Sequence, residues 1–91
     1  MDQEPQPFAP GSFSAAHKAE ITKDCAETLQ CSTQMGQQLS SDSMQDCLDD
    51  TALALERGGE RRQRRYLTDI ERCHALVACE YYACATMPSG D

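Results

Sequence analysis

The chain has 91 residues, and its 15 Asp and Glu against 8 Lys and Arg give a formal net charge of −7, which indicates one small acidic domain. Only 12 residues are Leu, Ile, Val or Phe and Trp is absent, so the composition excludes a large conventional hydrophobic core. Six cysteines offset this shortage, because three disulfides contributing roughly 2–4 kcal/mol each could stabilise so short a chain.

Residues 1–11 are rich in proline and polar side chains, which favours a flexible N-terminal tail. We expect residues 12–87 to form a single cysteine-rich helical domain and residues 88–91 to be a flexible C-terminus. Alternating polar and β-branched residues, which would indicate strands, are missing. The predicted fold class is therefore all-α.

The first helix is predicted to begin near Ser12 or Ser14 and to continue to about Met35, with Gly36 placed to stop it. Its apolar stripe is thin, because Thr28 and Ser32 interrupt it. We therefore expect this helix to depend on its cysteines for attachment to the rest of the domain.

The second helix is predicted from about residue 41 to the Gly58–Gly59 pair, which should end it. Its apolar positions follow the i, i+3, i+4, i+7 spacing of an amphipathic helix. They are Met44, Cys47, Leu48, Thr51, Ala52 and Leu55.

A third helix is predicted from about Glu60 to about Cys84, ending before Pro88. The short loops between these helices favour antiparallel neighbours and hence an up-down-up three-helix bundle. A helical hairpin with an independent extra helix is the alternative arrangement.

Six cysteines are candidates for disulfides: Cys25, Cys31, Cys47, Cys73, Cys79 and Cys84. Pairs five or six residues apart within one helix are too distant to be bridged, so the bridges should join different helices. In an antiparallel hairpin centred on residues 38–39, the favoured pair is Cys31–Cys47. The competing set is Cys25–Cys79, Cys31–Cys73 and Cys47–Cys84, and Cys79 could also form an intermolecular bridge.

Disulfides require an oxidising compartment, so we expect a secreted or periplasmic protein rather than a cytoplasmic one. The first residues lack the basic and apolar regions of a secretory signal, which suggests that a leader is absent from the sequence given. The longest apolar run, from residue 75 to 79, is too short to span a membrane.

A partner-binding surface is predicted on the acidic face of the second helix and near the end of the third. Acidic faces and exposed tyrosines can both contribute to protein interfaces, although Tyr81 is equally well placed for the core. The candidates are Asp46, Asp49, Asp50, Leu53, Tyr81 and Tyr82.

The strongest charge feature is a basic cluster formed by Arg61, Arg62, Arg64 and Arg65. Residues 57–72 carry six Arg against three acidic residues, a net charge of +3, whereas residues 1–56 carry ten acidic residues against two Lys, a net charge of −8. We expect acidic side chains of the second helix to neutralise this cluster, so nucleic-acid binding is not favoured.

Motifs for catalysis and cofactor binding are missing. The chain has no C-x-x-C pair and no glycine-rich phosphate loop, so we expect neither an enzyme nor a bound cofactor. No closely spaced metal-ligand pair occurs either. A zinc or copper site is conceivable only if Cys73, Cys84 and His74 on one helix face were joined by Cys47.

The sequence as a whole favours a small exported, disulfide-stabilised helical protein that binds another protein, as an inhibitor, an accessory subunit or a secreted factor. A homodimer is also possible. The alternatives are a cysteine-rich protein that binds zinc or copper, and a reduced acidic inhibitor of the cytosol.

Overall fold

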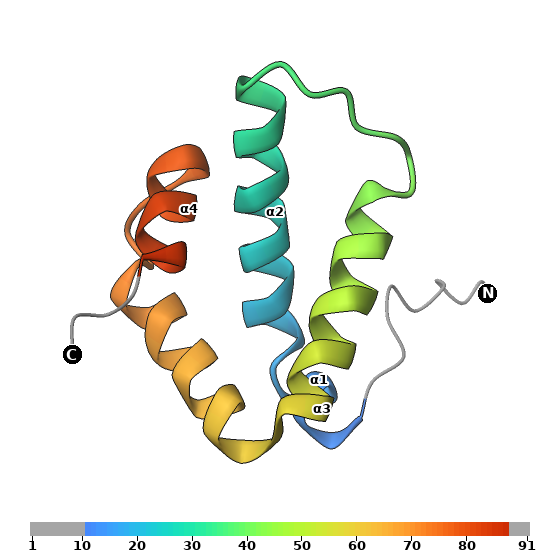
Figure 1. The fold of residues 1–91 in the computed structure, drawn as a ribbon, viewed down its shortest axis with the longest axis vertical. Helices are drawn as coiled ribbons and strands as arrows, with labels where there is room; N and C mark the ends of the chain where they lie inside the picture. Colours follow the sequence, from blue (N-terminus) through green and yellow to red (C-terminus); the bar gives the residue numbers. More distant parts are fainter. Residues whose placement is uncertain (1–10, 88–91) are drawn as a thin grey trace.

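The computed structural model describes residues 11–87 and contains four α-helices: α1 (Ser12–Ala16), α2 (Lys18–Gln34), α3 (Ser43–Arg72) and α4 (Ala78–Thr86) (Figure 1). No strand occurs within this range, so the prediction of an all-α, disulfide-stapled fold is confirmed. The two predicted flexible tails lie outside the described residues, except for Gly11.

The predicted first helix is not continuous, because the helical geometry breaks at His17 between α1 and α2. The short α1 contacts α3 through the carboxylate of Glu56. The backbone N–H and the hydroxyl of Ser14 both donate to Oε2 of Glu56, each at 3.0 Å. Gly11 is part of this contact and not of a tail, since an added Cβ would lie 2.6 Å from the Glu56 carboxyl carbon.

Helix α2 ends at Gly36 as predicted. Gly36 has a φ of +92°, its N–H donates to the Thr33 carbonyl, and the N–H of Gln37 donates to the Ser32 carbonyl. These two bonds make a Schellman motif, in which a left-handed residue closes the last turn of a helix. Gly36 thereby directs the chain into the loop that leads to α3.

Helix α3 is divided at Gly59, where the backbone has φ +80° and ψ −175°. The predicted break at the glycine pair is therefore a sharp kink between a first arm (residues 43–58) and a second arm (residues 60–72) (Figure 1). The side-chain amide of Gln63 donates to the Leu55 carbonyl at 2.9 Å, which provides a donor for a carbonyl beside the break. The two arms are thus tied to each other across the kink.

We expect Gly59→Ala to lower the free energy of unfolding by about 2 kcal/mol, because this combination of φ and ψ is accessible almost only to glycine. No neighbouring atom lies within 4 Å of the added Cβ, so the cost comes from the backbone. Urea denaturation would measure it. A synthetic chain with D-alanine at this position is the control, because a D-residue favours positive φ and should retain most of the stability. Equal losses in both variants would contradict the explanation.

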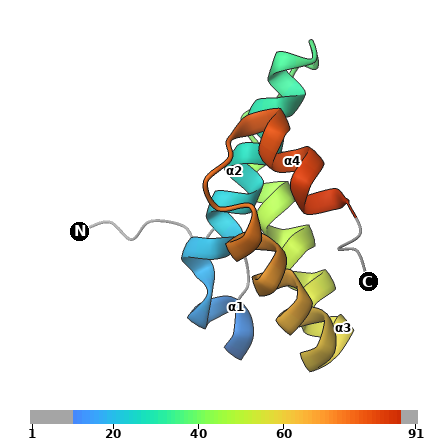
Figure 2. The same ribbon diagram turned by 90° about the vertical axis from the view of Figure 1, so that its left-hand side faces the viewer.

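The predicted third helix is also not continuous. Helix α3 ends at Arg72, residues 73–77 form a turn, and α4 then runs back along α2 (Figures 1 and 2). The turn is fixed by Glu27 of α2, whose Oε1 accepts the N–H of Ala78 at 2.7 Å. Ala78 has a φ of +52°, a strained value for alanine that this contact helps to maintain.

The three disulfides join Cys25 to Cys47, Cys31 to Cys79 and Cys73 to Cys84, with Cα–Cα distances of 5.9, 4.4 and 5.9 Å. Both predicted pairings were wrong, namely Cys31–Cys47 and the set built on antiparallel first and third helices. The reason is the reversal of the chain after Arg72, which places Cys79 next to Cys31. Because Cys31 is bonded to Cys79, Cys47 pairs with Cys25 instead. Cys79 is bonded within the chain, so it does not form the suggested intermolecular bridge.

Helix α2 lies in the middle of the fold, with the first arm of α3 on one side and α4 on the other (Figure 1). The core is small, and half-buried apolar residues surround it. One cluster of the core consists of Ile21, Cys25, Leu48, Ala52 and Leu55, and the other buried apolar side chains include Ile70, Cys73 and Tyr81. None of the six residues of the predicted second stripe is exposed, so that amphipathic pattern is confirmed.

Candidate binding cleft

A cleft of about 530 Å³ lies between the two arms of α3, with α2 contributing one residue to it. The first arm contributes Asp50, Thr51, Ala54 and Leu55, the second arm contributes Arg62, Arg65, Tyr66 and Asp69, and α2 contributes Asp24. The volume is that of a small-ligand site, but the lining is rich in charge. The kink at Gly59 creates this cleft, because it sets the second arm at an angle to the first (Figure 1).

Asp24 accepts hydrogen bonds from two tyrosines where the helices meet. The Tyr66 hydroxyl donates to its Oδ2 at 3.1 Å and the Tyr81 hydroxyl donates to its Oδ1 at 2.8 Å. Burial raises the pKa of both phenols above the ordinary value of 10, and the negative charge of Asp24 raises each further. Both hydroxyls therefore remain protonated donors, and one carboxylate links α2, α3 and α4.

These pKa shifts predict a loss of stability at alkaline pH. Below pH 10 the phenols are protonated in both the folded and the unfolded chain, so their contribution is constant. Above pH 10 the unfolded chain releases these protons while the folded chain retains them, so the free energy of unfolding falls. Urea denaturation between pH 8 and 11 should show this fall, and it should be smaller in a Tyr66→Phe/Tyr81→Phe variant.

The prediction for Tyr81 as a partner-binding residue was wrong, because its side chain is completely buried. Its ring lies under the Lys23 ammonium, 5.1 Å from the ring centre, and its hydroxyl is bonded to Asp24. The reversal of α4 turns this face toward α2. Tyr81 is therefore a core residue.

Tyr82, the neighbouring candidate, remains 44 % exposed and lines a second cleft of about 180 Å³. The two clefts share Asp24, Tyr66 and Asp69. The two clefts are therefore adjacent, and charged and aromatic side chains from α2, α3 and α4 line them.

The predicted acidic face lies on the first arm of α3. Asp46 and Asp50 are exposed, Asp49 is half-buried and Leu53 is 49 % exposed. Of these four, only Asp50 lines the larger cleft. The acidic face therefore begins at the rim of the cleft and continues over the outside of the arm.

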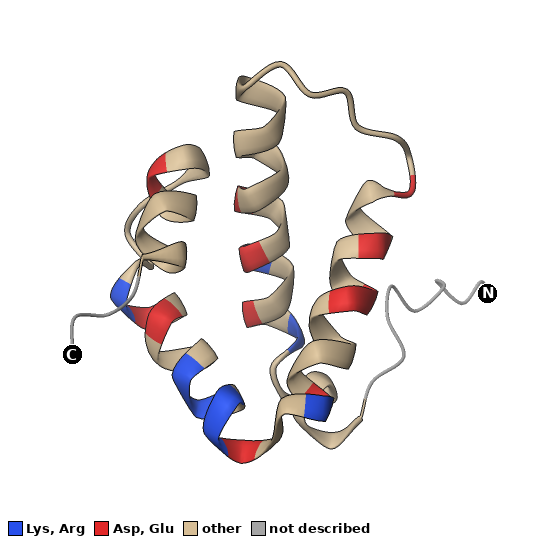
Figure 3. Cartoon of the chain, in the orientation of Figure 1, with Lys and Arg blue, Asp and Glu red and all other residues tan. Residues whose placement is uncertain are grey.

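The basic cluster occupies the second arm, opposite the acidic first arm (Figure 3). Arg62 and Arg65 line the larger cleft, whereas Arg61 and Arg64 are exposed without lining it. Among the described residues, Arg64 pairs with Glu60 of its own arm at 2.9 Å, and no ion pair joins the cluster to the first arm. The expected neutralisation by that arm is thus not seen, and Glu56 contacts Ser14 instead.

The structure does not support the metal-binding alternative in its predicted form. Cys47, Cys73 and Cys84 are all in disulfides, so none is a thiolate ligand that could join His74. Within residues 11–87, no three His, Cys, Asp or Glu side chains converge as metal ligands would. The presence of disulfides also contradicts the reduced cytosolic inhibitor.

None of the described helices combines the length and hydrophobicity needed to cross a membrane. No protein-family model matches the chain, and neither curated proteins nor solved structures match it significantly.

Sequence reasoning missed the contacts of three carboxylates that join the helices, namely Asp24, Glu27 and Glu56, of which only Asp24 lines the clefts. Each accepts hydrogen bonds from residues more than 40 positions away in the chain. Helical periodicity carries no signal for such contacts. The two tyrosines gave a weak indication, because a buried tyrosine hydroxyl generally needs a hydrogen-bond acceptor. That rule does not say which residue is the acceptor.

Proposed function

We propose that this protein is a small exported helical protein that acts by binding another protein, and not by catalysis. The observation that carries the proposal is the charged cleft between the two arms of α3, together with the acidic face at its rim. The kink, the Gln63 bond and the disulfides fix these side chains before any partner arrives. Such preorganisation lowers the entropic cost of association.

The three disulfides point to an oxidising compartment. We propose export to the periplasm or the extracellular space as the specific location. A chain with this few buried apolar side chains gains its rigidity from the cross-links, which persist there and are reduced in the cytosol.

The partner surface favoured by this arrangement is basic. Asp46, Asp49 and Asp50 present three carboxylates around the exposed Leu53, a polar surface with one apolar anchor. Electrostatic attraction of this kind speeds association and weakens as salt rises.

The test is co-isolation of a partner by the immobilised, oxidised protein from the fluid of its own compartment, followed by measurement of affinity with the identified partner. The triple variant Asp46→Asn/Asp49→Asn/Asp50→Asn should bind about tenfold more weakly at low salt. The matched control, Glu60→Gln/Glu71→Gln/Glu80→Gln, changes the net charge equally on exposed residues elsewhere and should bind like the wild type. Equal affinity of the two variants would remove the acidic face from the proposal.

A further inference from the structure

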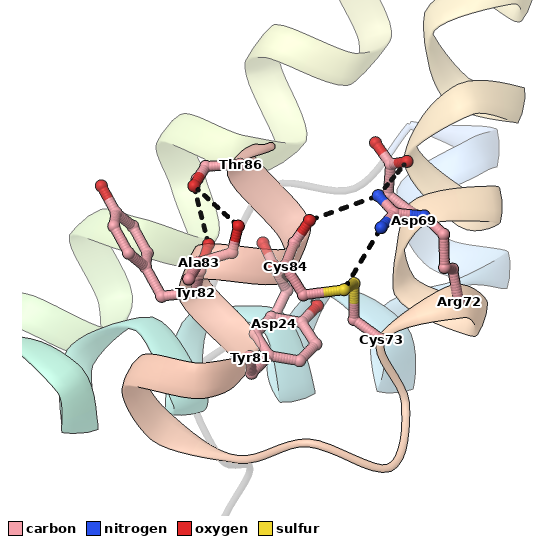
Figure 4. The surroundings of a disulfide bond; sticks show 9 residues. All are labelled: Asp24, Asp69, Arg72, Cys73, Tyr81, Tyr82, Ala83, Cys84 and Thr86. Atoms are coloured by element: carbon pink, nitrogen blue, oxygen red, sulfur yellow. Dashed lines mark hydrogen bonds and ion pairs between the residues drawn. A yellow bond between two sulfur atoms is a disulfide. The ribbon is translucent and has the colours of Figure 1, made fainter. Parts of the chain in front are cut away.

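We propose that Cys73–Cys84 is a reactive disulfide, which exchanges with external dithiols before the other two bonds do. The structural basis is a guanidinium placed directly against one of its sulfurs. Figure 4 shows Arg72 reaching from the end of α3 to Cys84 on α4. This reactivity goes beyond the binding role and does not depend on it.

The contact is specific in geometry. Nη1 of Arg72 donates to Sγ of Cys84 at 3.3 Å, and Nη2 donates to the Cys84 carbonyl oxygen at 3.3 Å. Nη2 also donates to Oδ1 of Asp69 at 3.1 Å, which orients the guanidinium and offsets part of its charge. The Arg72 side chain is 38 % exposed, so this side of the disulfide faces solvent.

Thiol–disulfide exchange is sensitive to such a charge. A thiolate attacks Sγ of Cys84, the more accessible sulfur because Cys73 is completely buried. A mixed disulfide with Cys84 forms, the bond to Cys73 breaks and Cys73 leaves as a thiolate. The second thiol of the reagent, as its thiolate, then displaces Cys84, so the dithiol is oxidised and the protein disulfide is reduced.

Negative charge spreads over all three sulfurs during the first attack. A cation at Cys84 attracts the incoming thiolate and stabilises this charge, so it should accelerate the step. The Arg72 guanidinium is therefore expected to raise the rate of exchange. If Arg72 only stabilised the fold through its pair with Asp69, it would not change this rate.

The other two disulfides lack this arrangement in the part of the chain that the structure describes. The sulfurs of Cys25–Cys47 lie against the apolar core and contact the Thr51 hydroxyl at 3.7 and 3.9 Å. For Cys31–Cys79, the sulfur contacts are the Met35 thioether at 3.8 Å and the Cys31 carbonyl at 3.5 Å. Neither disulfide has a cationic hydrogen-bond donor.

Opening Cys73–Cys84 would loosen only one end of α4. The other end remains tied to α2 by Cys31–Cys79 and by the Glu27 contact. The freed end carries Ala85 and Thr86, which line the smaller cleft. The redox state of this one bond would therefore change the shape of that cleft while the fold persists.

The experiment is timed reduction of the full chain by dithiothreitol, with alkylation of the released thiols and peptide mapping by mass spectrometry. We expect Cys73 and Cys84 to be alkylated first. In Arg72→Gln, this opening should slow by about three- to tenfold. Arg64→Gln removes the same charge from an exposed pair on the same arm and should leave the rate unchanged.

A second measurement tests the proposal in the wild type, so it does not depend on whether the Arg72 variant folds correctly. In the wild type, raising the salt concentration should reduce the rate of Cys73–Cys84 opening relative to that of Cys31–Cys79, because salt screens the charge on Arg72. Earlier opening of another disulfide, or equal rates in the Arg72 and Arg64 variants, would overturn the proposal.

Discussion

Replacing Cys31 and Cys79 together by alanine is expected to lower the free energy of unfolding by about 4 kcal/mol, the largest effect of removing any one disulfide. The bond closes a loop with a sequence separation of 48 and ties α4 to α2. Its loss increases the conformational entropy of the unfolded chain more than loss of a bond across a shorter loop would. Urea denaturation followed by circular dichroism would measure the change.

The comparison variant is Cys73→Ala/Cys84→Ala, whose bond has a sequence separation of 11. Its expected cost is smaller, about 3 kcal/mol, by the same loop-closure relation. If the short loop proved the more costly to lose, the entropic explanation would be wrong, and native-state contacts around Cys73 would account for its stability instead.

The second large effect is expected at Asp24. Asp24→Ala leaves the hydroxyls of Tyr66 and Tyr81 without their acceptor, and we expect a loss of about 3 kcal/mol. Asp24→Asn retains one acceptor oxygen and should cost less. Thermal and urea unfolding at pH 7 would measure both variants.

A double-mutant cycle isolates the cause of this loss. In a Tyr66→Phe/Tyr81→Phe background, there is no hydroxyl left to satisfy, so Asp24→Ala should cost much less than in the wild type. An unchanged cost would show that the carboxylate stabilises the fold through some other contact.

The local features of this fold were predictable from sequence. The periodicity of residues 44–55 identified the first arm of α3, and Gly36 and Gly59 marked places where the helical path changes. Each of these signals is contained within about a dozen neighbouring residues. Local signals of this kind were sufficient for the fold class and for the changes of direction at Gly36 and Gly59, but not for the break at His17 or the turn at residues 73–77.

The disulfide pairing and the course of α4 were not predictable in the same way. Residues 73–84 read as one helix with two apolar faces, because the residues that face α2 and those that face α3 both fall at helical spacings. The start of α4 at Ala78 is bonded to Glu27, which lies 51 positions earlier in the chain. Once α4 reverses, its cysteines meet partners that no single continuous helix could reach.

The candidate site was predicted in part. The acidic residues and arginines were identified, but their separation by a cleft follows from the angle at Gly59, which sequence does not give. Tyr81 and Tyr82 are adjacent and chemically identical, and only the orientation of α4 assigns one to the core and the other to the surface.

The overlapping pattern of the three disulfides has a consequence for proteolysis. The disulfides close loops over residues 25–47, 31–79 and 73–84, and each loop overlaps the next in sequence. A single peptide-bond cleavage anywhere between Cys25 and Cys84 therefore leaves two fragments that remain one covalent molecule. Between Cys47 and Cys73, where the arginines offer sites to trypsin-like proteases, Cys31–Cys79 alone holds the fragments together.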